Sequence, residues 1–385
     1  MLSFVGLDNV IYILGSVLLS IAMLLARFNV KVLSGFFYIT AITVILSVLS
    51  TLLVNGVGVQ SFVKLMWFIF NYMLLATIVK EKNDSQYSDI CRFFIFISWI
   101  LVLDFLISVV FLSGHRANEG VSHIFLPAPF DVYFGLIAIP FLLNKGWKNL
   151  LLVVLILVKL YMSTRAAIFA VLPCFILMTV ALIYNRNKRL SWSVKLILIF
   201  SLIIFILMTS YYLVLQFREG DITEPYSMIA RLVIWSNYLQ LMVDYPFGLG
   251  PQGAQKILAF YDHTELIMSS EWLKRIFDAD IVKYRQNIYI SRSQFPSAHS
   301  IHVELITSFG IFGVLIWLHL LMMLIKDFIF ALSGKYMLFS TIYSSFVAIL
   351  IYGLFNNFNS GAFFLVLMYV IYFIYRQRER AIVIP

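Results

Sequence analysis

Two residues of this chain, Arg231 and His299, are placed to bind an anion and to move a proton. Arg231 lies in Arg-Leu-Val-Ile-Trp, and a guanidinium binds a phosphate or a carboxylate through two parallel hydrogen bonds without losing its charge. His299 lies in Ser-Ala-His-Ser, just before a long apolar run. A histidine at such a boundary accepts a proton near neutral pH, as a general base must. Simpler interpretations stay open. Arg231 could instead pair with lipid headgroups or with an acidic residue of the polar segment 217–298, and His299 could instead be the N-terminal cap of a helix.

Two more residues extend this candidate site. Arg165 stands in Met-Ser-Thr-Arg, a very short connection between two apolar runs. A charge so close to hydrocarbon needs a partner, either an anionic ligand or interfacial water. His302 and Glu304 follow His299 within a turn and a half, so one helix end offers three ionisable groups. We predict that Arg231, Arg165 and His302 bind substrate.

The sequence predicts neither a metal nor a cofactor. His299 and His302 have no clear third ligand beside them, which a zinc site would need. Cys91 and Cys174 lie in or beside apolar runs without CxxC spacing, so no disulfide framework is indicated. There is no phosphate-binding loop, no nucleophile elbow, no HExxH and no dinucleotide fingerprint. The energy for any reaction must therefore come from a membrane gradient or an activated substrate.

Composition places these residues in a membrane protein. Hydrophobic residues make up 62% of the chain and charged residues only 12%, whereas soluble chains are about one quarter charged. Apolar runs of about 20 residues, the length a helix needs to cross the bilayer, recur from end to end. The net charge of +9 follows from basic loops between spans, so no nucleic-acid partner is predicted. The predicted class is an all-α polytopic membrane protein in the lipid bilayer.

We predict about eleven transmembrane helices in a single membrane domain covering residues 1–385. Fifteen Lys and Arg residues fall in one alternate set of connections, whereas the short loops of the other set hold only Arg116 and Arg165. This bias predicts an outside N-terminus and a cytoplasmic C-terminus. The first run is expected to be a retained span rather than a cleaved signal. The predicted spans are 9–26, 32–54, 61–79, 90–113, 129–143, 149–162, 166–184, 193–215, 300–325, 337–355 and 360–375.

Three ionisable residues lie inside these predicted spans. Lys64 and Lys159 are close to the outer ends of their helices, so we expect both to extend toward the interface. Asp104 is deeper, and a hydrogen bond in helix packing is expected there. With Arg165 and Arg231, the two lysines would form a basic outer cluster suited to a polyanionic headgroup.

One polar segment, residues 217–298, interrupts the apolar spans and forms the predicted external lobe. It holds 17 of the 47 charged residues of the chain. Within it, 225–245 is predicted as a helix that Thr223 caps and Pro246 ends, with Arg231 and Trp235 one turn apart on the same face. The Pro-Phe-Gly-Leu-Gly-Pro sequence that follows predicts a turn.

These elements resemble a known family, the bacterial O-antigen polymerase and O-antigen ligase superfamily. Arg231, Trp235 and the Pro-Phe-Gly-Leu-Gly turn resemble its "R…W…P.fG.G" signature. His299, followed by Gly310 and Gly313, resembles its "HN…L…E.G..G" entry into a transmembrane helix. Thr-Arg-Ala around residue 165 resembles its "SRg" element. Two departures are Ser300 for the usual Asn and Ser308 for the usual Glu, and the latter removes any role for that carboxylate.

The resemblance implies a C-class-like integral-membrane glycosyltransferase of the bacterial inner membrane that needs no metal and inverts the anomeric centre. Its donor would be a glycan on undecaprenyl diphosphate at the periplasmic face. A polymerase would transfer the growing chain to the next lipid-linked repeat unit, and a chain-length regulator protein is an expected partner. A ligase would transfer the finished chain to the lipid A core. His299, Arg231 and Arg165 would be the catalytic residues.

A transporter is the alternative from another functional class. Transporter sites lie near the bilayer midplane and are commonly built from discontinuous helices. Here the ionisable groups gather at one predicted face, and the sequence predicts no discontinuous helix. We therefore rank the polymerase first, the ligase second and the transporter third.

Overall fold

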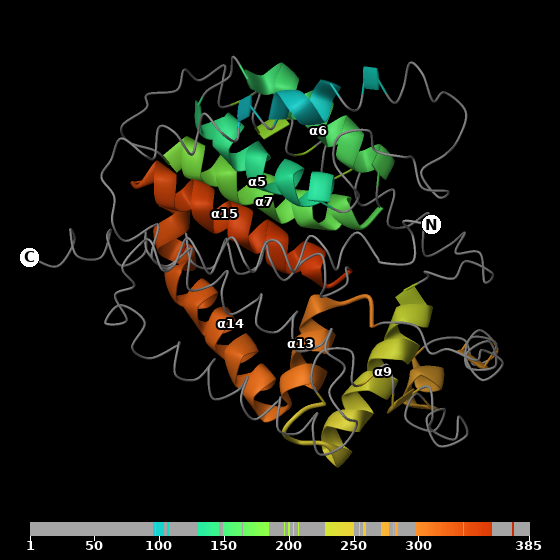
Figure 1. Cartoon of the computed structure of the whole chain (residues 1–385). Helices are drawn as coiled ribbons and strands as arrows, with labels where there is room; N and C mark the ends of the chain where they lie inside the picture. The colour runs from blue at the N-terminus through green and yellow to red at the C-terminus, as the bar shows by residue number, and fades with distance from the viewer. Residues whose placement is uncertain are drawn as a thin grey trace, which may run out of the picture. The chain divides into compact units, whose positions relative to one another are not determined.

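A computed structural model gives the structure of this chain (Figure 1). Within the residues that the structure describes, every regular element is a helix, as the sequence predicts. The chain divides into two compact units, of which the first comprises residues 1–77, 215–321 and 353–362, and the second comprises the remainder. The structure describes residues 130–145, 149–163, 165–184, 228–249, 271–276, 298–333 and 335–355, together with short runs and single residues elsewhere between 95 and 372.

Three apolar helices that follow one another in the sequence pack together in the second unit (Figure 1). They are α5 (Phe130–Lys145), α6 (Leu150–Ser163) and α7 (Arg165–Tyr184). Their bounds lie within about one turn of the predicted spans 129–143, 149–162 and 166–184. Apolar residues on all sides explain why these helices form a buried core rather than an amphipathic surface.

Helix α15 (Met337–Gly353) completes the described core of this unit. The Ser345 hydroxyl donates a hydrogen bond of 3.3 Å to the Ile137 carbonyl of α5. The rings of Tyr133 and Tyr352 meet edge to face at 4.9 Å. These contacts join segments that are far apart in the sequence, and the helix agrees with the predicted span 337–355.

The longest described helix, α14 (Ile311–Leu332), passes from an apolar start to a partly polar end. It is the one helix among the described residues with the length and composition of a membrane span, and several described apolar helices are shorter. The helix continues through Lys326 and Asp327, beyond residue 325, where the predicted span ends. Asp327 is buried and accepts a hydrogen bond from the Tyr372 hydroxyl, so its charge does not interrupt the helix.

Lys159 on α6 also differs from its prediction. Its side chain is 4% exposed and its Nζ donates to the Leu101 carbonyl at 3.3 Å. The ammonium is therefore bound inside the second unit rather than extended toward an interface. A carbonyl partner is what a lysine buried among apolar helices requires.

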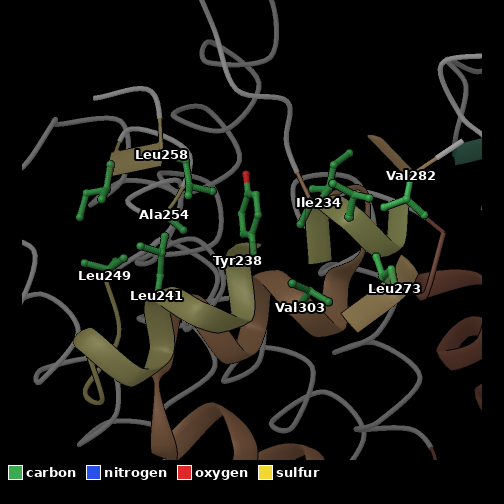
Figure 2. Packing of buried hydrophobic residues seen from close by; sticks show 12 residues of the cluster. Ile234, Tyr238, Leu241, Leu249, Ala254, Leu258, Leu273, Val282 and Val303 are labelled. Carbon is green, nitrogen blue, oxygen red and sulfur yellow. The ribbon is translucent and has the colours of Figure 1, made fainter. Parts of the chain in front are cut away.

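The first unit contains the described part of the polar lobe. Helix α9 (Met228–Asp244) packs against the short helix α13 (Ile301–Phe309), and the 3-10 helix η4 (Glu271–Arg275) contributes Leu273 to their core. Figure 2 shows Ile234, Tyr238 and Leu241 projecting from α9 into this core. The lobe helix therefore buries one face, as predicted, and begins in the structure at Met228.

Several predictions lie outside the described residues. These are the spans 9–26, 32–54 and 61–79, most of 90–113, 193–215 and 360–375, the residues Thr223, Lys64, Asp104 and Cys91, and most of the segment 250–297.

Candidate functional site

The site is built on one face of α9. Arg231, Trp235 and Tyr238 follow one another at intervals of about one turn, so all three project from the same side of the helix. Tyr238 is buried, whereas Arg231 and Trp235 are half-buried. The helix ends at Asp244, two residues before Pro246, which lacks the amide hydrogen that another turn would use.

The segment that carries His299 lies directly against this face. The Trp235 indole Nε1 donates a hydrogen bond of 2.8 Å to the Ala298 carbonyl, although the two residues are 63 positions apart. His299 has a φ of 47°, a left-handed conformation that side chains rarely adopt. Ser300 is the N-cap of α13, and its hydroxyl accepts a hydrogen bond from the Val303 amide at 3.4 Å. The helix-cap interpretation of His299 is therefore wrong, because Ser300 has that role.

The structure brings Arg231 and His299 together. Burial lowers the pKa of the His299 imidazole below its ordinary value of 6.5, and the positive charge of Arg231 lowers this pKa further. The guanidinium also lies over the Phe355 ring, 5.3 Å from its centroid, a geometry in which the ring attracts the cation. A fixed cation thus stands beside a largely neutral imidazole.

Tyr238 is a residue of this site that the sequence reasoning missed. Burial raises the pKa of its phenol well above the ordinary value, and the Glu304 charge raises this pKa further. A hydrogen bond from the Ala298 backbone partly opposes the shift. The signal was present in the sequence, because Tyr238 follows Trp235 by three residues on the same helix face. Phe355 had no such signal.

Two glycine-containing segments interlock behind the site. The Ile311 amide donates to the Pro246 carbonyl at 2.8 Å, and the Leu249 amide donates to the Thr307 carbonyl at 3.0 Å. Gly248 and Gly310 both have positive φ, at 85° and 57°. A Cβ on Gly310 would overlap the Pro246 carbonyl oxygen, and a Cβ on Gly248 would lie 2.6 Å from the Ser308 carbonyl carbon. Glycine is therefore required at both positions.

This interlock corrects the prediction of one continuous helix over 300–325. The helix breaks at Gly310, between α13 and α14. Hydropathy did not predict this break, because the residues on both sides of Gly310 are apolar. Gly313 keeps the two pieces close, since a Cβ there would lie 2.5 Å from the Leu305 carbonyl oxygen. The absence of a discontinuous helix therefore no longer argues against a transporter.

His302 and Arg165 occupy different surroundings from the Arg231–His299 pair. The His302 ring is buried, lies edge-on to Trp317 at 6.5 Å, and would place its Nε2 3.3 Å from a Cβ on Gly353. Direct binding of substrate by His302 stays a prediction. Arg165 begins α7 in the second unit, and its predicted cooperation with Arg231 also stays a prediction.

The arrangement can bind an anion and accept a proton at neighbouring positions. Arg231 supplies a permanent charge, and the lowered pKa of His299 keeps its imidazole in the proton-accepting form at neutral pH. In the part of the chain that the structure describes, no three potential metal ligands of the His, Cys, Asp or Glu type come together.

The comparisons with known proteins give one match. Residues 150–318 match the family model described as O-antigen ligase. The matched segment contains Arg165, α9, His299 and both glycines of the α13–α14 region, so it covers the motifs that carry the resemblance. No curated protein and no solved structure matches the chain.

Proposed function

Because this chain carries the O-antigen ligase family domain over residues 150–318, we propose that it is an O-antigen polymerase with Arg231 and His299 at its active site. The family comprises membrane glycosyltransferases of the ligase and polymerase type, which act on lipid-linked glycans. The family match and the apolar helices together indicate that this chain is a membrane protein. The proposal adds the choice of acceptor, the residues and their roles.

The observation that carries the proposal is the electrostatic interaction of the Arg231 guanidinium with the His299 imidazole, whose pKa is lowered by burial and by this charge. In the transfer, the acceptor hydroxyl oxygen forms a bond to the anomeric carbon while the bond from that carbon to the diphosphate oxygen breaks. The hydroxyl proton passes to His299, and the electron pair of the broken bond leaves with the diphosphate. Attack from the face opposite the diphosphate inverts the anomeric centre.

Each residue has a physical role in this step. Negative charge grows on the departing diphosphate, and one preorganised donor such as Arg231 lowers the barrier by about 3 kcal/mol. A positioned base such as His299 contributes roughly 10²–10⁴-fold in rate. Arg165 is the candidate for a second cation on the diphosphate. The interlocked segments at Gly248 and Gly310 join the end of α9 to the end of α13.

We favour the polymerase because its donor and acceptor carry the same lipid diphosphate, so one kind of basic site serves both substrates. Arg165 and Arg231, which both lie in the matched segment, are the arginines that we assign to this site. The ligase is the second candidate, since the description of the matched family names it. In the proposed setting the lobe faces the periplasm, where the lipid-linked repeat units and a chain-length regulator meet the enzyme.

Glycan banding on a gel, from a strain lacking this chain, tests the proposal. We expect the long chains to be lost while a single repeat unit remains on the core. Bare core with long chains left on the lipid carrier would instead identify a ligase. An unchanged banding pattern would refute both functions.

Variants returned to that strain test the residues. Arg231→Lys should fail to restore long chains, because an ammonium cannot reproduce the two-pronged hydrogen bonding of the guanidinium. Arg275→Lys, the same exchange at the exposed end of η4, is the matched control and should restore them. Normal chains from a well-expressed Arg231→Lys variant would contradict the diphosphate role.

A further inference from the structure

We infer that Trp235 and Tyr238 are positioning residues that hold the His299 imidazole in place by binding the backbone of Ala298, the preceding residue. The inference rests on the proposed function of His299. Ala298 is fully buried and immediately precedes His299. Its carbonyl accepts the Trp235 indole hydrogen bond of 2.8 Å, and its backbone is also hydrogen-bonded to Tyr238. Two side chains of α9 therefore bind the backbone of Ala298, the residue before His299.

The backbone at His299 explains why such fixing is needed. Its φ of 47° is the one positive value at a non-glycine residue among those described, and a side chain persists in this conformation only where its surroundings impose it. On one side stands the anchored Ala298 carbonyl. On the other side Ser300 is extended, with φ −150° and ψ 119°, and caps α13. Without the Ala298 anchor, His299 can relax to an ordinary conformation and turn its ring away.

The same helix therefore supplies the cation and positions the base. Arg231 lies one turn before Trp235, and its charge acts on His299, whereas Trp235 and Tyr238 bind the backbone of Ala298. Trp235 also packs against the buried cluster that contains Val303 of α13, so its indole is itself held. Glu304 of α13 is a further charged group in this region, and its charge acts on Tyr238.

The test uses the full-length protein in lipid nanodiscs with isotope-labelled histidine. The chain has six histidines, so each imidazole gives a separable signal, and the loss of one signal in His299→Asn assigns His299. Trp235→Phe removes the indole donor, and Tyr238→Phe removes a single hydroxyl and so preserves the fold. Trp272→Phe is the matched control, because the indole Nε1 of the exposed Trp272 on η4 donates a hydrogen bond of 3.0 Å to the Ser236 hydroxyl of α9.

In Trp235→Phe and Tyr238→Phe, we expect the His299 signal to move and its titration midpoint to rise toward the ordinary 6.5, since the freed ring gains water and leaves Arg231. Glycan transfer should show kcat reduced on the order of 10–100-fold with KM nearly unchanged, as expected of a misplaced base. Trp272→Phe should leave the signal, the midpoint and kcat at their wild-type values.

Two outcomes separate this inference from the proposed function. If both variants keep the wild-type His299 signal and pH profile, the positioning roles are refuted, whatever the enzyme does. If the signal moves while transfer is unchanged in these variants and also in Arg231→Lys and His299→Asn, the positioning stands and the proposed function is refuted.

Discussion

Replacing Gly310 by alanine should disrupt the interlock between the Pro246–Leu249 turn and the α13–α14 break. At φ 57° and ψ −135°, Gly310 occupies backbone space that is open almost only to glycine, and an alanine there costs about 1–3 kcal/mol. The added Cβ would also lie 2.6 Å from the Phe247 carbonyl carbon. Because that atom belongs to the backbone, the two segments must move apart.

The movement breaks the hydrogen bonds that join the segments. The bond from the Ile311 amide to Pro246 is 2.8 Å long and that from the Leu249 amide to Thr307 is 3.0 Å. Each contributes about 1 kcal/mol net, so the total loss is about 3–5 kcal/mol. For a chain of 385 residues, this corresponds to a fall in Tm of about 5 °C. Glycan transfer should fall as well, because α9 and α13 carry the two halves of the site.

The assay is thermal unfolding of the purified full chain, with glycan transfer measured on the same sample. Gly135→Ala is the control, since its Cβ would meet only the flexible ends of Leu160 and Ile156, at 3.1 Å and 3.3 Å. Its Tm should stay within about 1 °C of the wild type. A Gly310→Ala variant with wild-type Tm and activity would refute the interlock as a structural requirement.

Three further predictions concern His299 and its neighbour Ser300. Glycan transfer should stay level from neutral pH down to 6.5 and fall only at lower pH, because burial and Arg231 lower the pKa of the His299 base; a fall already above pH 7 would contradict this. The unfolded chain protonates His299 near 6.5 while the folded chain resists, so stability should drop as the pH falls below about 6.5. This drop should be smaller in His299→Gln. Ser300→Ala should lower the free energy of unfolding by about 0.5–1 kcal/mol and speed amide exchange at Val303, since the α13 cap is lost. Ser300→Thr should preserve both, and equal exchange in the two variants would argue against the cap.

The sequence predicted the parts of the fold that depend on local patterns. Continuous apolar runs gave α5, α6, α7 and α15 within about one turn, because hydropathy alone decides whether such a segment is helical in a membrane protein. The spacing of Arg231 and Trp235 gave their shared face on α9. The family motifs were found in order, and the match over residues 150–318 confirmed the resemblance.

The parts that depend on distant contacts were not predictable. The break at Gly310 lies inside an apolar run, and its cause is a turn more than fifty residues earlier in the sequence. The predicted span ended at residue 325, yet α14 continues through Asp327, whose carboxylate accepts a hydrogen bond from the Tyr372 hydroxyl. Lys159 looked like an interfacial residue, yet the Leu101 carbonyl binds it. In each case a residue far away in the sequence determines the local structure, and the periodicity of the sequence does not indicate such a contact.

The central claim, that Arg231 and His299 work as one site, is tested most directly by a double-mutant cycle on purified protein with lipid-linked repeat units. Initial rates would be compared for wild type, Arg231→Lys, His299→Asn and the double variant. We expect each single change to lower the rate strongly and the double variant to be little slower than the more impaired single one, because residues that act as a unit lose their effect together. Rates that multiply independently, or a single variant with wild-type transfer, would contradict the claim.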